Sequence, residues 1–280
     1  MTEYKYWIVD DDTNDAKMGI IWLKINRPDK TNAFNEEMAI ELGEVLDSLM
    51  KNEELRVLIL GSNTNNFSAG ADIEWFARIS GEEAQEVSRK SHEIFGKMQE
   101  FKVPVIAAIK GFCFTAGLEL SLCADMIYVA DNAKLGLLET SFGITPGGGG
   151  TQRLVRLIGP NRAKEMIFNA RAVGAEEAFR IGLANAVFPL EEFDAKISRI
   201  ARKMIMNDEG AIARCKNLVN LATFSSEEGF REEEKCFNTS FASGEPRSRL
   251  TIFMKQQERA RKKIERKARK LAEKQKTEEL

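Results

Sequence analysis

Two glutamates stand in stretches that are otherwise apolar or small. Glu119 lies in 114-FTAGLEL-120, inside an apolar run from Val103 to Ala130, and Glu139 lies in 135-LGLLETSFGI-144. An ionised carboxylate that is buried without a partner is strongly unfavourable, so its presence needs a reason. Two carboxylates at the edge of an apolar pocket suit general acid–base catalysis, because desolvation and mutual repulsion separate their pKa values. Taken singly, either glutamate is more simply an ordinary carboxylate in the first turn of a helix.

Small residues accompany both glutamates and also fill one earlier loop. The three segments are 67-FSAGADI-73, 114-FTAGLEL-120 and 136-GLLETSFGITPGGGGTQRL-154. Such residues let the backbone approach a ligand closely, and the first N–H groups of a helix have no partner within it. We therefore expect the N–H group of Ala116 or Gly117, with a second donor from loop 67–73, to form an oxyanion hole. The glycine run 147–150 matches neither the P-loop nor the dinucleotide fingerprint, and its simpler interpretation is a flexible loop that caps a helix.

The elements that must position these loops alternate along the chain. The pattern predicts strands at 4–9, 19–25, 56–62, 104–109 and 126–130, and helices at 35–51, 81–101 and about 116–124. Alternation of this kind through residue 190 indicates an α/β fold. Beyond residue 191 only helical signals remain. We divide the chain into a core at 1–190, a helical region at 191–257 and a charged helical tail at 258–280.

Composition limits the classes of function. The chain has 280 residues, 43% hydrophobic and 30% charged, with a net charge of −2, which is typical of a soluble globular protein without general affinity for nucleic acid or membrane. From Lys255 onward there are eleven Lys or Arg and five Asp or Glu residues, which favour a solvated helix over a nucleic-acid-binding patch. The four cysteines have no metal-binding spacing, so we expect reduced thiols, no metal and a cytoplasmic protein. We expect neither a signal peptide nor a membrane span.

In combination, five phrases resemble the enoyl-CoA hydratase (crotonase) superfamily. They follow in the family's order over about residues 6–257, and they are 26-NRPDKTNAF-34, 67-FSAGADI-73, 104-PVIAAIKGFCFTAGLELSLCADMIYVA-130, 136-GLLETSFGITPGGGGTQRL-154 and 174-GAEEAFRIGLANAV-187. The resemblance implies a crotonase-like spiral of ββα repeats with a C-terminal helical trimerisation region. It also implies a homo-oligomer, either a trimer or a dimer of trimers.

The resemblance assigns roles to the small residues and to both glutamates. Ala71 and Ala116 match the two N–H donors of the oxyanion hole. Glu119 matches the glutamate that activates water, and Glu139 matches the one that protonates the α-carbon. Gly147 matches the position whose N–H group helps to hold that water.

Further matched positions imply contacts with coenzyme A. Ala69, Asp72 and Ile73 match residues around the adenine, Lys30 and Asn32 match the loop along the CoA moiety, and Phe253 and Lys255 match positions that reach the CoA of a neighbouring subunit. The chain departs from the family at Glu74, where many members have lysine, at Leu138, where proline is usual, and at 245–253, which lacks the usual acid–glycine pair.

The implied reaction is the reversible addition of water to a trans-2-enoyl-CoA, which gives a 3-hydroxyacyl-CoA without a metal or redox cofactor, since CoA is part of the substrate. The alternatives on the same scaffold are an enoyl-CoA isomerase, a dienoyl-CoA hydratase and a CoA-thioester hydrolase. Both glutamates are present, and this favours hydration. A non-catalytic RNA-binding protein that uses the basic tail is a further alternative, which would leave the two glutamates unexplained.

Three residues outside the matched roles carry separate expectations. His92, the only histidine, lies in none of the phrases, and we expect a partly exposed residue on the helix at 81–101. Trp75 and Phe76 follow the first oxyanion loop. They either line an acyl pocket or hold the hydrophobic core together.

Overall fold

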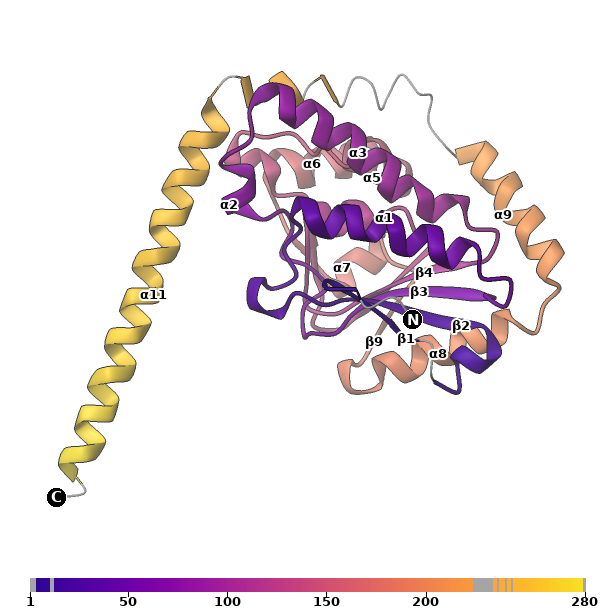
Figure 1. Ribbon diagram of the computed structural model, residues 1–280, viewed down its shortest axis with the longest axis horizontal. Coiled ribbons are helices and arrows are strands. Elements are labelled where there is room, and N and C mark those ends of the chain that lie inside the picture. Colours follow the sequence, from indigo (N-terminus) through magenta and orange to yellow (C-terminus); the bar gives the residue numbers. More distant parts are fainter. Residues whose placement is uncertain are drawn as a thin grey trace.

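The computed structural model describes residues 4–10, 13–223, 234–235, 237–239, 241–242 and 244–278. Within these ranges strands alternate with helices up to residue 188, and only helices follow (Figure 1). The strands are β1 (Trp7–Asp10), β2 (Ile20–Ile25), β3 (Val57–Ser62), β4 (Val105–Ile109), β5 (Phe112–Phe114), β6 (Met126–Ala130), β7 (Lys134–Gly136), β8 (Val173–Gly174) and β9 (Ala186–Phe188). The α-helices are α1 (Glu36–Met50), α2 (Ile73–Phe76), α3 (Gly81–Glu100), α4 (Ala116–Ser121), α5 (Gly150–Ile158), α6 (Pro160–Phe168), α7 (Ala175–Arg180), α8 (Phe193–Met204), α9 (Glu209–Thr223) and α11 (Glu245–Glu278). Short 3-10 helices are η1 (Ala16–Met18), η2 (Pro28–Lys30), η3 (Glu139–Phe142) and η4 (Leu190–Glu192).

The strands form two sheets between which the chain passes repeatedly. The larger sheet has the order β1-β2-β3-β4-β6-β9, and every pair in it except β1 with β2 is parallel. After β4 the chain enters β5, and after β6 it enters β7, so each turn leaves the larger sheet for the smaller one, whose order is β5-β7-β8. A parallel bridge between Ser68 and Cys113 adds the turn after β3 to the same layer. The predicted α/β class is confirmed, and the repeated turns form the expected spiral.

The longer helices begin where the sequence predicts, because side chains satisfy their first N–H groups. Asn35 caps α1 by accepting from the Met38 N–H group at 2.9 Å. Ser80 and Glu83 form a capping box at the start of α3. Both helices lie over the same side of the larger sheet (Figure 1). The chain between α1 and α3, which includes the loop after β3, is thereby anchored at both ends on that side of the larger sheet.

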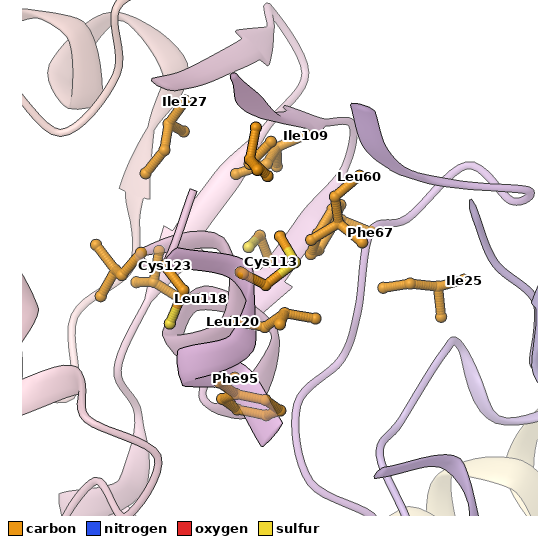
Figure 2. Close-up of a cluster of buried hydrophobic side chains, with 14 of the residues drawn as sticks. Ile25, Leu60, Phe67, Phe95, Ile109, Cys113, Leu118, Leu120, Cys123 and Ile127 are labelled. Atoms are coloured by element: carbon orange, nitrogen blue, oxygen red, sulfur yellow. The ribbon is translucent and has the colours of Figure 1, made fainter. Parts of the chain in front are cut away.

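The helix α4 lies inside the main hydrophobic core. Figure 2 shows Leu118 and Leu120 of α4 among Phe67, Phe95 and Cys113, which come from three other parts of the chain. All five side chains are buried. Burial of an aliphatic side chain of this size contributes about 1.5–3 kcal/mol, so the helix that carries Glu119 is firmly anchored.

The C-terminal helices join the core in different ways. Helix α8 covers the other face of the larger sheet through the buried residues Phe193, Ile197 and Ala201. Helix α9 is attached by Lys216, whose ammonium group lies 2.8 Å from the Asp125 carboxylate. Helix α11 extends far from the body (Figure 1), and it continues without a break across the predicted boundary at 257. Helix continuity does not test a division by function, so the three-part division of the chain stays a prediction. Within the described ranges, no helix is long and apolar enough to cross a membrane.

Candidate active site

One cavity of about 1080 Å³ brings the predicted site residues together. Every residue that the sequence assigns to catalysis or to CoA lines it, with the single exception of Asn32. Its walls come from the loop after β3, from α2 and α3, from the start of α4, from η3 and the glycine loop that follows, and from α11. Segments far apart in the sequence therefore form one cavity large enough for a sizeable ligand.

The Glu119 carboxylate is buried and fixed by the glycine loop. The side chain is 4% exposed, and Oε1 accepts from the N–H groups of Gly148 at 2.8 Å and Gly150 at 2.9 Å. Only glycine leaves enough room here, since a Cβ atom on Gly148 would lie 2.8 Å from Oε2 and one on Gly150 would lie 3.0 Å from Oε1. The buried charge thus has N–H partners that also set its direction. Sequence reasoning selected Gly147 and missed the two glycines that hold the carboxylate, because a backbone N–H donor leaves no side-chain signature.

The glycine loop is itself held from two sides. The Ser88 hydroxyl on α3 donates to the Gly147 carbonyl at 2.7 Å, and the Arg153 guanidinium on α5 donates to the Gly148 carbonyl at 2.9 Å. Both side chains are buried. The loop that orients Glu119 is therefore fastened to two helices.

The expectation for His92 was wrong, because this side chain is buried and only 9% exposed. It shares the inner face of α3 with Ser88 and Phe95, the face that packs on the glycine loop. Its Nδ1 lies 3.5 Å from Oε1 of Glu234. Burial lowers the pKa of His92; the nearby Glu119 opposes this effect, Arg153 adds to it and Glu234 opposes it. The histidine is therefore neutral at neutral pH.

Glu139 opens η3 at another side of the same cavity. Its side chain is 7% exposed, and its carbonyl accepts from the Ile144 N–H group at 3.1 Å. The Thr140 hydroxyl donates to the carbonyl of Ile167, which ties this turn to α6. The cavity therefore has two carboxylates on separate, independently braced elements.

The two backbone donors predicted for the oxyanion hole lie on either side of Thr115 in different ways: Ala116 follows it in the chain, and Ala71 contacts its hydroxyl group. The first bond within α4 runs from the Glu119 N–H group to the Thr115 carbonyl at 2.9 Å, so the N–H group of Ala116 precedes the helical pattern. The N–H group of Ala71 donates to Thr115 Oγ1 at 3.0 Å. Sequence reasoning treated Thr115 as one more small residue and missed this contact.

The residues expected to contact CoA line the cavity, except for one. Lys30 pairs with Glu74 at 3.1 Å, and Asp72 caps α2 while it pairs with Arg27 at 2.7 Å. Asn32 is fully buried, and its amide donates to oxygens of the neighbouring loop 62–67. Its role in the structure is therefore to shape this loop, and the contact that the resemblance implied would be indirect.

The C-terminal helix contributes to this chain's own cavity. Phe253 packs edge-on against Phe142, with 5.2 Å between the ring centroids, and Lys255 lies nearby on the cavity wall. The resemblance had implied contact with a neighbouring subunit's CoA. Within this chain, both residues already border its own site.

An aromatic wall closes the cavity beside Gly147. Phe237 is 3% exposed, and its ring lies 2.6 Å from where a Cβ atom of Gly147 would be. Trp75 and Phe76 line the cavity and belong to the same hydrophobic cluster as Phe237. The two interpretations of Trp75 and Phe76 thus describe one arrangement, in which core packing forms the apolar wall.

Comparison with known proteins identifies the family. The enoyl-CoA hydratase/isomerase family model matches residues 15–263. The chain is 34% identical over 242 residues to the crotonyl-CoA hydratase of Syntrophomonas wolfei, which covers 86% of this chain and 92% of that protein. It is also 34% identical over 245 residues to the mitochondrial methylglutaconyl-CoA hydratase of Mus musculus, over 85% of this chain and 78% of that protein.

A solved structure agrees with the sequence comparison. The enoyl-CoA hydratase from Bacillus anthracis superposes with a TM-score of 0.73 and 33% identity, over 84% of this chain and 90% of that one. The family model spans residues 15–263, and this range contains the strands of both sheets except β1, together with the two carboxylates of the cavity. The chain therefore belongs to the enoyl-CoA hydratase/isomerase family.

Proposed function

We propose that this chain is an enoyl-CoA hydratase that adds water reversibly to a trans-2-enoyl-CoA to give a 3-hydroxyacyl-CoA. The observation that carries the proposal is the cavity in which Glu119 and Glu139 lie on separate elements and the backbone at Ala71 and Ala116 supplies polar groups. The named activities of its relatives support the same reaction.

The proposed mechanism uses the two carboxylates in different roles. The thioester carbonyl oxygen binds on the side of the cavity where Ala71 and Ala116 lie. Glu119 takes a proton from water as the water oxygen attacks Cβ, and Glu139 gives a proton to Cα. Negative charge grows on the carbonyl oxygen during the attack, so donors at that oxygen bind the transition state more tightly than the ground state. Gly147 borders the position of the attacking water.

Coenzyme A enters this proposal as part of the substrate, and acid–base chemistry completes the reaction without a metal or redox cofactor. In this proposal the adenine end lies against Ala69, Asp72 and Ile73, and Lys30 follows the CoA moiety. Phe253 and Lys255 on α11 line the same cavity. The acyl chain points toward the aromatic wall that Phe237 completes.

We propose the homotrimer or dimer of trimers that the family resemblance implies, and exposed apolar side chains on the C-terminal helices support an interface between copies. Leu218 on α9 is 65% exposed and Ile252 on α11 is 54% exposed, which leaves apolar surface for a second copy of the chain. Light scattering on the purified protein measures the mass directly. In the described part of the chain Cys113, Cys123 and Cys215 form no disulfide, which agrees with a reducing compartment. Cys236 lies outside the described residues, and a cytoplasmic location stays a prediction.

The test of the reaction is loss of the conjugated-thioester absorbance of crotonyl-CoA, with the product identified by mass spectrometry. A product heavier than the substrate by one water supports hydration. A product of unchanged mass with a moved double bond would identify an isomerase, and release of free CoA would identify a thioester hydrolase. Because the two named relatives act on different acyl groups at equal identity, longer and branched enoyl-CoAs are assayed beside crotonyl-CoA.

A further inference from the structure

Thr115 has a backbone conformation that its residue type rarely adopts. Its φ is 46° and its ψ is −120°, in a region where β-branched side chains are strained. It stands between β5 and α4, directly before Ala116, and it is one of the residues that line the cavity. Strained residues of this kind persist where the surrounding structure over-determines them, and they gather at functional sites.

The surroundings of Thr115 are built around its hydroxyl group. Its N–H group donates to the Gly136 carbonyl at 2.9 Å, and its carbonyl accepts the first bond of α4. Gly70 has a φ of 104°, and a Cβ atom there would lie 1.9 Å from Thr115 Oγ1, so only glycine leaves space for this hydroxyl. The bridge between Ser68 and Cys113 fixes the two segments against each other.

The Thr115 hydroxyl is the acceptor for the Ala71 N–H group, and both residues line the cavity. Oγ1 accepts from that N–H group at 3.0 Å, so the position at which Ala71 would meet a ligand oxygen is already taken. Among the residues that the structure describes, only the Ala71 N–H group forms a hydrogen bond with Oγ1, which leaves the hydroxyl proton available for an acceptor in the cavity.

We propose that the Thr115 hydroxyl is a catalytic donor of the oxyanion hole: it donates its proton in a hydrogen bond to the thioester oxygen while the Ala71 N–H group holds Oγ1. The inference rests on the proposed function, because it assumes a thioester in this cavity. The proton stays on Oγ1, and no covalent bond is formed or broken at Thr115. The bond strengthens as charge grows on the oxygen, and Ala71 polarises the hydroxyl from behind.

Three substitutions separate this role from the opposite one, in which the hydroxyl merely blocks the Ala71 N–H group until substrate displaces it. Thr115→Ser keeps the hydroxyl, Thr115→Val keeps the shape without it, and Thr115→Ala removes both. A donor role predicts that kcat on the best enoyl-CoA stays within about 3-fold for Thr115→Ser and falls about 100-fold or more for Thr115→Val. Thr115→Ala falls as well, with KM changed much less than kcat. Val and Ala variants that fold, as judged by thermal melting, and match or exceed the wild-type kcat overturn the proposal.

A wild-type measurement covers the case in which these variants do not fold. In a crystal structure with bound acetoacetyl-CoA, the proposal places Thr115 Oγ1 within hydrogen-bond distance of the thioester oxygen while it still accepts from Ala71. A hydroxyl that has turned away, with the Ala71 N–H group bonded directly to the ligand oxygen, overturns it. A wild type that hydrates no enoyl-CoA removes the proposed function, whereas an active wild type with unaffected variants removes only the role of Thr115.

Discussion

Substituting Gly148 with alanine should misplace the catalytic carboxylate without removing it. The new Cβ atom would lie 2.8 Å from Glu119 Oε2, 3.1 Å from its Cδ and 3.1 Å from Phe95 Cε2. Comfortable contacts between such atoms begin near about 3.5 Å, so the carboxylate must retreat by roughly 0.5 Å. It is held at Oε1 by the N–H groups of Gly148 and Gly150, so a retreat stretches both bonds. Gly148 is not among the residues with positive φ, so its backbone tolerates alanine.

The expected result is a kcat reduced by about 10–100-fold, because a misplacement of about 1 Å at a catalytic group reduces rates about 100-fold. Crowding in a packed interior should lower the free energy of unfolding by about 1–3 kcal/mol. The assay is crotonyl-CoA hydration at saturating substrate, with thermal melting on the same preparation. Gly96→Ala on α3 is the matched control, since among the described residues no atom outside its own helical turn lies within 4 Å of the added Cβ atom. It should keep full activity and gain up to about 1 kcal/mol of stability. A Gly148→Ala enzyme with wild-type kcat would refute the claim that this loop sets the position of Glu119.

Three further predictions concern the surroundings of the site. Because the pKa of His92 is lowered in the folded chain, the unfolded chain binds the proton first below about pH 6.5, and stability falls as the pH falls. In urea unfolding, the stability advantage of wild type over His92→Gln should therefore shrink from about pH 7.5 to about pH 5.5, and a constant difference would contradict this. Desolvation raises the pKa of Asp125 and lowers that of Lys216 although they pair at 2.8 Å. Lys216→Met alone should therefore lower the free energy of unfolding by about 3 kcal/mol, because it leaves the Asp125 carboxylate buried without its partner. Adding Asp125→Asn in the same chain should recover most of this loss, whereas additive losses would refute the coupling. Phe237→Ala should destabilise the chain by about 3 kcal/mol, because it removes a buried ring. The space left beside Gly147 should raise kcat/KM for long enoyl-CoAs relative to crotonyl-CoA, and an unchanged chain-length profile would show that Phe237 does not contact the acyl chain.

The sequence predicts the long elements of this fold well because they carry their own signals. The caps at Asn35 and Ser80 and the apolar runs of β3, β4 and β6 mark their boundaries within a residue or two. The smaller sheet escaped detection, since strands of two or three residues, such as β5 and β8, are too short to show a period of two.

Some residues of the candidate site carry a local sequence signal, and others do not. Glu119 and Glu139 stand out as acids in apolar stretches, and the order of the motifs identified the loops. The burial of His92 depends on which face of α3 meets the glycine loop, and the contact between Thr115 and Ala71 joins residues 44 positions apart. Both are properties of tertiary packing, which local sequence patterns do not encode.

The most direct test of the two-glutamate mechanism is the rate of crotonyl-CoA hydration by wild type, Glu119→Gln and Glu139→Gln, with binding of a saturated acyl-CoA measured on the same proteins. Glutamine keeps the shape of each side chain and removes its ability to exchange a proton. The proposed mechanism predicts that both variants bind the saturated acyl-CoA like wild type and lose hydration by orders of magnitude. Either variant retaining the wild-type rate would contradict the assignment of the two glutamates as base and acid.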